Sequence, residues 1–325
     1  MCKKIKKNTI LLVITICTIT IALIIFGCVG YYLNKIKGEK LNESKISITS
    51  KQDIRENLDK KEQEKMHATT NILLLGVDSD EKASDAMIVL TIDQTDKTIK
   101  LSSLMRDSYV DFGPGKITKL NYAYHYGGNE LVVKTINEQF KLDIKDYIQV
   151  DYSGLTNIID YVGGITVDVL PEEVKYINVY CKDIAKVNNI KYTPIHRSGN
   201  QKLNGEQATA YCRIRYVGNN DYQRTQRQRM ILTKIVNKLM NKNIIEYPSI
   251  INELSPYVKT SLDSIEICKL AKSFASYAKK GIKQTRCPYD GLRNDAMINE
   301  IYYMKWDKEE NIKKLHNFIY LSKQE

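Results

Sequence analysis

The chain has 325 residues, of which 43% are hydrophobic and 27% are charged. This balance is that of an ordinary globular protein, and roughly 250 residues follow the N-terminal region, enough for one large α/β domain or two small ones. The net charge of +11 indicates an anionic partner. Charge alone does not choose among nucleic acid, a membrane surface, phosphate and an acidic polymer.

The N-terminus has the pattern of a membrane anchor. Residues 1–8 form a lysine-rich head, and no further charge occurs before Lys35. The apolar core 9–29 is long enough to cross about 30 Å of hydrocarbon as a helix. The positive head predicts that the N-terminus lies inside. We therefore expect a cytoplasmic tail, a single-pass transmembrane anchor over 9–33 and an extracytoplasmic remainder at the cell membrane.

Two alternatives to the anchor stay open. A cleaved signal peptide is the nearest, although no small-x-small site closes the apolar run convincingly. A lipoprotein would use Cys28, but Phe26 is bulky for that pattern. From 34 to 67 the chain is polar and rich in lysine and glutamate, which predicts a solvated stalk that holds the rest of the protein off the bilayer.

Three apolar runs then predict an antiparallel meander of strands over 71–78, 85–93 and 98–105. The first strand ends at Asp78 and the second begins near Asp85, so both carboxylates meet at one end of the sheet. The third strand runs back and delivers Arg106 and Asp107 to that end. The meander therefore predicts a cluster of acids and an arginine.

Helices and strands alternate after the meander, which predicts an α/β layered sandwich with a central mixed or antiparallel sheet flanked by helices. We expect a catalytic domain over 68–245 and packed helices and strands over 246–325. The expected elements are a helix over 129–140, a strand over 147–152, a helix over 153–161, a strand over 165–169, helices over 205–212 and from 221, strands near Cys287 and Tyr302, and a last helix from Lys308.

Arginines are concentrated just before and within the helix that begins at Asp221. Arg224, Arg227 and Gln228 share one helix face near the N-terminus, where anions are favoured. Asp221 is the only acid between 213 and 229, so local ion pairs do not account for the arginines. Guanidinium groups match phosphate oxygens, and anion binding is therefore favoured over a solvated surface helix.

Asp78 and Asp85 complement the arginines. Alone, two aspartates at strand ends are typical turn residues. Beside a phosphate site they suit Mg²⁺ or Mn²⁺, which bridges carboxylates and phosphate oxygens.

The cysteines form no CxxC pair and no zinc spacing. Four of them lie beyond the anchor, at 181, 212, 268 and 287, and two disulfides of unspecified pairing are possible. Isolated buried thiols are favoured, because no dense disulfide framework is present.

Several motifs, taken in order and spacing, resemble the LytR-CpsA-Psr phosphotransferases of bacterial cell walls. The resemblance covers roughly residues 71–239. The motifs are Leu-Leu-Gly-Val-Asp78, Ser84-Asp85, Leu104-Met-Arg106-Asp107-Ser-Tyr-Val110, Lys119-Leu-Asn121-Tyr-Ala-Tyr, Val162-Gly-Gly-Ile-Thr-Val-Asp168, Leu203-Asn-Gly-Glu-Gln-Ala208, Tyr211-Cys-Arg213-Ile-Arg215 and Asp221-Tyr-Gln-Arg224-Thr-Gln-Arg227-Gln228-Arg229.

The resemblance implies transfer of a phosphorylated glycopolymer from a polyprenyl pyrophosphate carrier to a cell-wall hydroxyl, such as one on peptidoglycan. The lipid tail would lie in an apolar tunnel and its head among arginines. By family analogy the catalytic residues are Arg106, Arg213, Arg215 and Asp221. Substrate contacts would come from Lys82, Lys119, Asn121, Arg224, Arg227 and Gln228, and the divalent metal would be held by Asp78 and Asp85.

One departure from the family pattern affects a phosphate contact. The family often has an arginine just before the Ser-Asp pair, where this chain has Ala83 preceded by Lys82. A lysine is a point charge and does not form the arginine fork. Met105 stands where proline is usual.

Two other functions remain open at this stage. One is an anchored regulator that binds polyanions without transfer activity, and the other is a polyprenyl-pyrophosphate pyrophosphatase. Nucleic-acid binding is disfavoured, because the sequence has no RNP pattern, zinc finger or basic zipper.

Overall fold

The computed structural model describes residues 38–321, apart from residues 57, 59, 61, 79–81, 114, 219, 244 and 245. The predicted anchor over 9–33 lies outside this range. Among the described residues, no helix has both the length and the apolar character needed to span a bilayer.

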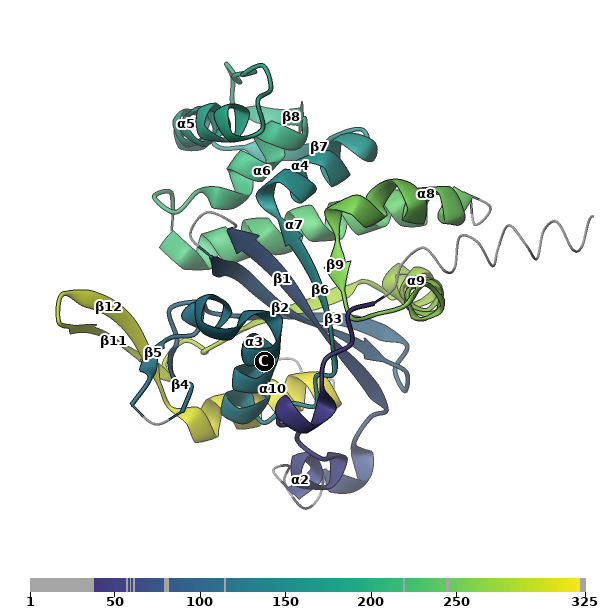
Figure 1. Ribbon diagram of the computed structural model, residues 1–325, viewed down its shortest axis with the longest axis vertical. Coiled ribbons are helices and arrows are strands. Elements are labelled where there is room, and N and C mark those ends of the chain that lie inside the picture. Colours follow the sequence, from purple (N-terminus) through teal and green to yellow (C-terminus); the bar gives the residue numbers. More distant parts are fainter. Residues whose placement is uncertain are drawn as a thin grey trace, which may run out of the picture.

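A six-stranded mixed sheet forms the centre of the molecule, in the order β10-β3-β2-β1-β6-β9 (Figure 1). The predicted meander is confirmed, since β1–β2 and β2–β3 are antiparallel, whereas β6 runs parallel to β1 and β10 parallel to β3. The strands are β1 (Thr69–Asp78), β2 (Ala83–Asp93), β3 (Thr98–Leu104), β6 (Asp146–Asp151), β9 (Lys259–Thr260) and β10 (Ile282–Cys287).

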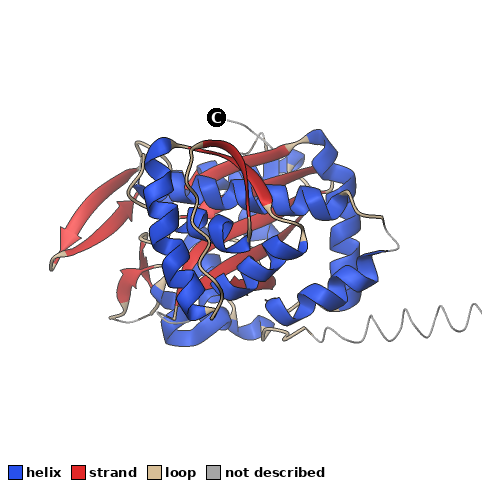
Figure 2. Ribbon diagram, turned by 90° about the horizontal axis from the view of Figure 1, so that it is seen from above, coloured by secondary structure: helices blue, strands red, loops and turns tan. Residues whose placement is uncertain are grey.

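Three two-stranded antiparallel sheets complete the strands of the described residues. One of them, β11–β12, projects from the body in both views (Figures 1 and 2). The pairs are β4 (Tyr109–Asp111) with β5 (Ile117–Lys119), β7 (Ile165–Val169) with β8 (Gly199–Leu203), and β11 (Arg293–Ile298) with β12 (Ile301–Trp306).

Helices cover both faces of the central sheet, as the α/β prediction requires (Figure 2). The α-helices are α2 (Lys51–Glu56), α3 (Tyr122–Phe140), α4 (Tyr152–Tyr161), α5 (Pro171–Val187), α6 (Gly205–Arg213), α7 (Asn220–Met240), α8 (Tyr247–Leu254), α9 (Ser264–Tyr277) and α10 (Lys308–Leu321). Single 3-10 turns occur at Glu43–Lys45, Gln63–Lys65, Ser255–Tyr257 and Ala278–Lys280.

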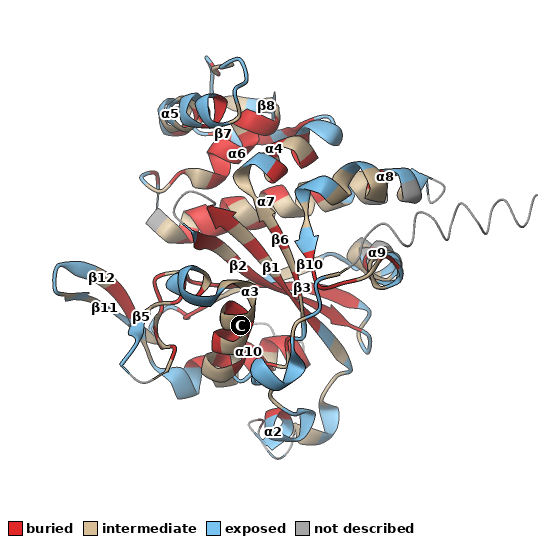
Figure 3. Ribbon diagram, in the orientation of Figure 1, coloured by how far each residue is buried: buried red, intermediate tan, exposed pale blue. Residues whose placement is uncertain are grey.

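The alternation of side chains along β1 explains this layering. Leu73 and Leu75 point into the core shared with α3 and α10. Leu74 points to the opposite face, where it packs with residues of α7 and α9. Both faces of a strand between two helical layers are apolar, and Figure 3 shows the buried residues concentrated along the sheet. A third core lies among α4, α5, α6, β7 and β8.

The region predicted as a solvated stalk is instead part of the domain. Ile46 and Ile54 are fully buried in the core with α3. Asn137 Nδ2 donates to the Ile46 carbonyl oxygen at 2.8 Å. The charged residues of this stretch lie on its outer side, and their number made the sequence resemble a solvated stalk although two isoleucines are buried. The predicted stalk boundary is therefore wrong from residue 38 onward.

Two smaller differences have local causes. Helix α3 begins at Tyr122, seven residues before the predicted Asn129, and the predicted helix is the segment that follows a kink where Gly127 and Gly128 have non-helical dihedral angles. Helix α4 is capped by Asp151, whose side chain accepts from the Gly154 N–H, and not by Ser153. The four cysteines of the described residues are free, and three of them are buried.

Candidate active site

Asp85 lies at the centre of a group of arginines at one end of the sheet. Its Oδ1 atom is 2.7 Å from Arg106 Nη1, 3.4 Å from Arg215 Nη2 and 3.9 Å from Arg224 Nη1. Arg106 follows β3, Arg215 follows α6, and Arg224 lies in the first turns of α7. The meander and the arginine-rich helix therefore meet at one carboxylate.

The second oxygen of Asp85 accepts a short hydrogen bond from the hydroxyl of Tyr152, the first residue of α4. Burial alone would raise the pKa of Asp85. The charges of Arg224 and Arg106, with the Tyr152 hydrogen bond and Arg215, outweigh burial and hold that pKa below its ordinary value. Asp85 is therefore ionised and is itself one anion bound by three arginines.

Arg224 is the most deeply buried arginine of this group, with 1% of its surface exposed. None of its three guanidinium nitrogens makes a hydrogen bond. Its nearest carboxylate oxygen is Asp221 Oδ1, 3.2 Å from Nη2. Buried polar groups are almost always hydrogen-bonded, so these unsatisfied donors fit an additional anionic ligand.

Asp107 and Asp221 form a coupled pair beside Arg106. Burial, together with a hydrogen bond that the protonated Asp221 carboxyl donates to Asp107, raises the pKa of Asp221 in spite of Arg224. For Asp107, burial is outweighed by the Asp221 hydrogen bond and by Arg106, and its pKa is lowered. Lys119 Nζ lies 2.8 Å from Asp107 Oδ1 and fixes the charge there. Asp221 is therefore the better proton acceptor of the two.

Arg213 reaches the site through aromatic rings. Its guanidinium carbon lies 4.6 Å from the ring centroid of Tyr152 and 5.1 Å from that of Tyr180. Cation–π contacts of this kind hold a guanidinium without consuming its hydrogen-bond donors. Neither Tyr152, which follows β6, nor Tyr180, which lies in α5, was predicted as a site residue. Nothing in the local sequence distinguishes them among 22 tyrosines.

Arg227 is not brought to the Asp85 group. Its Nε donates to Glu173 Oε1 at 2.8 Å, and its other nitrogens donate to the carbonyl oxygens of Ile214 and Val217. Both members of the Arg227–Glu173 pair are buried. These contacts favour a structural role over the predicted substrate contact, because each donor group is already engaged inside the protein.

The remaining predicted residues are placed as follows. Asn121 is buried, its backbone N–H donates to the Arg106 carbonyl oxygen at 3.1 Å, and its Oδ1 has no hydrogen-bond partner. Gln228 is half-buried on α7, and Lys82 is exposed in the turn before β2 with a φ of 50°. Asp78 is buried at the end of β1, opposite Ala83 in the register.

A metal bound here would be held by Asp78 and Asp85. Both are buried carboxylates at the adjoining ends of paired strands, and oxygen is the donor type that Mg²⁺ and Mn²⁺ prefer. The Asp85 oxygens are occupied by arginines and Tyr152, so metal binding requires the arginines to exchange Asp85 for phosphate oxygens. The donor set fits the ion on that condition.

An apolar cavity of about 330 Å³ lies between the sheet and helices α7, α8 and α9. Helix α7 links it to the arginines, since Arg224 occupies its first turns and Leu232 and Val236 line the cavity. The remaining apolar lining includes Leu74, Leu90 and Leu101 of the sheet, Leu254 of α8, and Leu270 and Phe274 of α9.

The sequence matches the LytR_cpsA_psr family over residues 33–318. Among curated relatives, the polyisoprenyl-teichoic acid–peptidoglycan teichoic acid transferase TagU of Enterococcus faecalis is 32% identical over 252 residues, which are 74% of this chain and 75% of the relative. The TagU of Bacillus licheniformis is 29% identical over 314 residues, which are 94% of each chain.

Among solved structures, the B. subtilis protein YwtF (TagT), with bound octaprenyl pyrophosphate lipid, has the same fold. Its TM-score is 0.57 at 24% identity, and the match covers 77% of this chain and 89% of that chain. At this identity the likeness supports the fold alone.

Proposed function

The chain belongs to the LytR_cpsA_psr family, and we propose that it transfers a phosphorylated glycopolymer from a polyprenyl pyrophosphate carrier to a cell-wall hydroxyl, such as one on peptidoglycan. The observation that carries this proposal is the approach of Arg106, Arg215 and Arg224 to one buried carboxylate, with an apolar cavity further along the helix that carries Arg224. The TagU relative, a teichoic acid transferase by name, supports the reaction class.

The two parts of the proposed substrate match the two parts of the site. A polyprenyl tail is wholly apolar, and the lining of the cavity under α7 is almost entirely so. A pyrophosphate is a dense anion, and the unsatisfied nitrogens of Arg224 offer buried donors for it. Because both features share one helix, the substrate would lie along α7 with its head at the N-terminal end, where the helix dipole also favours an anion.

The chemistry follows from this placement. The acceptor hydroxyl attacks the sugar-side phosphorus, a new P–O bond forms, the pyrophosphate bond breaks, and polyprenyl phosphate leaves. The arginines neutralise charge on the non-bridging oxygens in the transition state. Asp221, whose pKa is raised by burial and by Asp107, receives the proton of the hydroxyl, while Lys119 keeps Asp107 ionised.

The proposal includes a divalent metal. Asp78 and Asp85 would hold Mg²⁺ or Mn²⁺, and the ion would supply charge neutralisation at the pyrophosphate. Phosphate oxygens would take the place of Asp85 as partners of the arginines. The proposal also includes the predicted single-pass anchor over 9–33, with the catalytic domain outside the cell membrane.

The test is transfer by the purified full-length chain, in detergent, from a polyprenyl pyrophosphate-linked saccharide to wall fragments. Arg215→Ala is a suitable variant because 34% of the Arg215 side chain is exposed, so folding does not depend on it. We expect a loss on the order of a hundredfold in rate. Arg197→Ala, at an exposed arginine, is the matched control. Release of saccharide phosphate to water alone would point to a pyrophosphatase, and binding without turnover to a regulator.

A further inference from the structure

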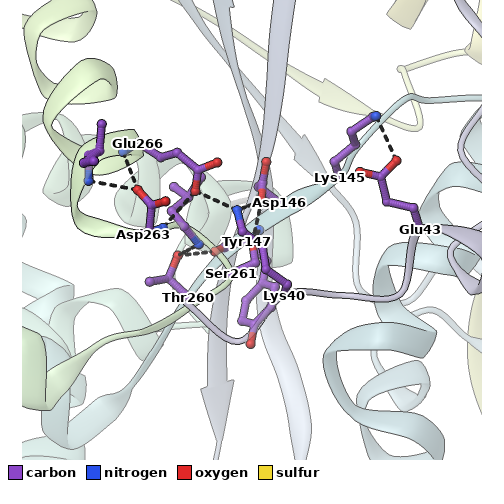
Figure 4. Close-up of polar contacts among 11 residues, drawn as sticks. Lys40, Glu43, Lys145, Asp146, Tyr147, Thr260, Ser261, Asp263 and Glu266 are labelled. Atoms are coloured by element: carbon purple, nitrogen blue, oxygen red, sulfur yellow. Dashed lines mark hydrogen bonds and ion pairs between the residues drawn. The ribbon is translucent and has the colours of Figure 1, made fainter. Parts of the chain in front are cut away.

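The first described residues are fastened to the edge of the sheet beside α9 (Figure 4). The Glu39 N–H donates to the Thr260 carbonyl oxygen of β9 at 2.8 Å. Lys40 Nζ lies 2.7 Å from Glu266 Oε2 in the first turn of α9 and 4.0 Å from Asp146 Oδ1 of β6. The chain therefore enters the domain at β9 and α9.

Gly38 adds a steric constraint at this point. A Cβ atom at Gly38 would stand 2.2 Å from the Ser261 carbonyl oxygen, a distance that no side chain tolerates. The backbone of Gly38 thus lies directly against the segment that joins β9 to α9.

The distance from this point to the predicted anchor is short. The apolar run ends at Val29, and nine peptide steps lead to Gly38. Nine residues span at most about 32 Å when fully extended. Since the described residues between 38 and 67 pack on the domain and do not form a stalk, this tether alone separates α9 from the membrane.

Helix α9 has two contrasting faces. Its inner face carries Leu270 and Phe274, which line the apolar cavity. Its outer face carries Ile265, which is 51% exposed, with Lys269 and Lys272 exposed at helical spacing from it. An outer stripe of one large apolar residue and two lysines suits the surface of an anionic bilayer.

From the tether, the fastening and the two faces of α9, we propose that the outer face of α9, with β9 and residues 38–40, docks on an anionic phospholipid bilayer. The cavity then lies behind α9, close to the bilayer, and the polyprenyl tail enters it from the lipid phase. This inference rests on the proposed anchor and lipid substrate. The short tether selects the bilayer as occupant, because it keeps this face within reach of the surface in every extension of the chain.

The hairpin β11–β12 provides a matched control surface. Its Met297 is 64% exposed, and Figure 1 shows the hairpin and α9 on opposite sides of the molecule. A bilayer docked on α9 contacts Ile265 and leaves Met297 in water. A protein partner or non-specific adhesion would not give this difference in lipid contact between the two positions.

The experiment places a tryptophan at each position in full-length protein reconstituted into vesicles with brominated phosphatidylglycerol. The single native tryptophan, Trp306, is first replaced by Trp306→Phe, which keeps the ring stacked on Phe140. We expect bromine to quench Ile265→Trp at least several-fold more than Met297→Trp. Equal quenching, or stronger quenching of Met297→Trp, would overturn the proposal.

An unsubstituted chain gives a second measurement if the tryptophan variants fold poorly. Cys268 is exposed on α9, and peptide mapping separates its labelling from that of other cysteines. We expect a charged maleimide to label Cys268 at least several-fold more slowly in anionic vesicles than in detergent. An unchanged rate contradicts docking.

The charge requirement is tested by Lys269→Glu/Lys272→Glu against Lys182→Glu/Lys186→Glu, at two exposed lysines of α5. We expect only the α9 pair to lower transfer from lipid carrier in anionic vesicles, with both pairs active in detergent. If the α9 variant is active in detergent and transfers at the parental rate in anionic vesicles, the proposed docking face is wrong and the proposed function still stands. If the unsubstituted chain shows no transfer in either detergent or vesicles, the proposed function itself is wrong.

Discussion

Arg224 holds its guanidinium 3.9 Å from the Asp85 carboxylate and makes no hydrogen bond there, although it is almost fully buried. Burial lowers the pKa of Arg224, and so does the charge of Arg106. Arg106 and Arg224 both lie near the carboxylates of Asp85 and Asp221, yet the three Arg224 nitrogens remain without a hydrogen bond, and unsatisfied buried donors are costly. The position of Arg224 beside Asp85 therefore indicates a site arranged for an anionic ligand.

The first prediction concerns the shape of the Arg224 donor group. Arg224→Lys keeps the charge but loses the planar fork, so we expect transfer to fall on the order of a hundredfold. Turnover and thermal unfolding are measured together. If the variant unfolds like the parent and still transfers at the parental rate, Arg224 does not bind the pyrophosphate.

The second prediction concerns the metal. We expect Asp78→Asn to weaken Mn²⁺ binding by about tenfold or more, because one of two carboxylate ligands becomes neutral. Titration of Mn²⁺ by electron paramagnetic resonance measures this without turnover. Asp183→Asn, at an exposed residue of α5, is the control. Equal affinity in both variants, or transfer that persists in chelator, argues against a metal at Asp78.

The third prediction separates Arg227 from the catalytic group. Arg227→Met leaves the buried Glu173 carboxylate without its ion-pair partner, and we expect a loss of about 3–5 kcal/mol in the free energy of unfolding. Adding Glu173→Gln removes the stranded charge and recovers part of that loss. Denaturant unfolding of both variants and the parent checks this. No difference in stability between the parent and Arg227→Met would refute the structural role.

The sequence was sufficient for the features that local patterns encode. The meander places Arg106 near Asp85 through strand direction alone, and the helix from residue 220 carries Arg224 at its beginning. The pairing of Arg227 with Glu173 joins residues 54 positions apart. No local pattern distinguishes Arg227 from Arg224, because what separates them is the position of α5.

The supposed stalk failed for a related reason. Ile46 and Ile54 lie in a polar stretch rich in lysine and glutamate, and their burial depends on α3, whose packing residues come roughly ninety positions later. Tyr152 is likewise recognised only once β6 brings it to Asp85. Tertiary partners, and not local composition, decide these three positions.

The fourth prediction concerns the buried ion pair of Lys100 and Asp93, whose Nζ and Oδ2 atoms lie 2.8 Å apart. Lys100 Nζ also donates to the Ile319 carbonyl oxygen of α10 at 2.6 Å. We expect Lys100→Met to cost about 3 kcal/mol of unfolding free energy, since the Ile319 carbonyl oxygen loses its donor and Asp93, although it keeps its contact with His67 Nδ1, loses its buried counter-charge. Lys100→Met/Asp93→Asn is the control and should be less destabilised. A double variant as unstable as the single one would assign the loss to packing.

The last prediction concerns His316, which is fully buried in α10 and has Nε2 3.0 Å from the Phe140 carbonyl oxygen. Burial lowers its pKa from 6.5 to about 4. Between these values the unfolded chain binds the proton and the folded protein does not, so stability falls as pH falls. The difference corresponds to a loss of about 3 kcal/mol by pH 4.

Unfolding free energies of the parent and His316→Gln, measured from pH 7 to pH 4, isolate this contribution. Glutamine offers a donor to Phe140 and does not titrate, so the gap between the two curves should shift in favour of the variant as pH falls below 6.5. His196→Gln, at an exposed histidine, should track the parent throughout. Parallel curves for the parent and His316→Gln would mean that His316 accepts its proton in the folded protein, which its burial and its unsatisfied Nδ1 atom argue against.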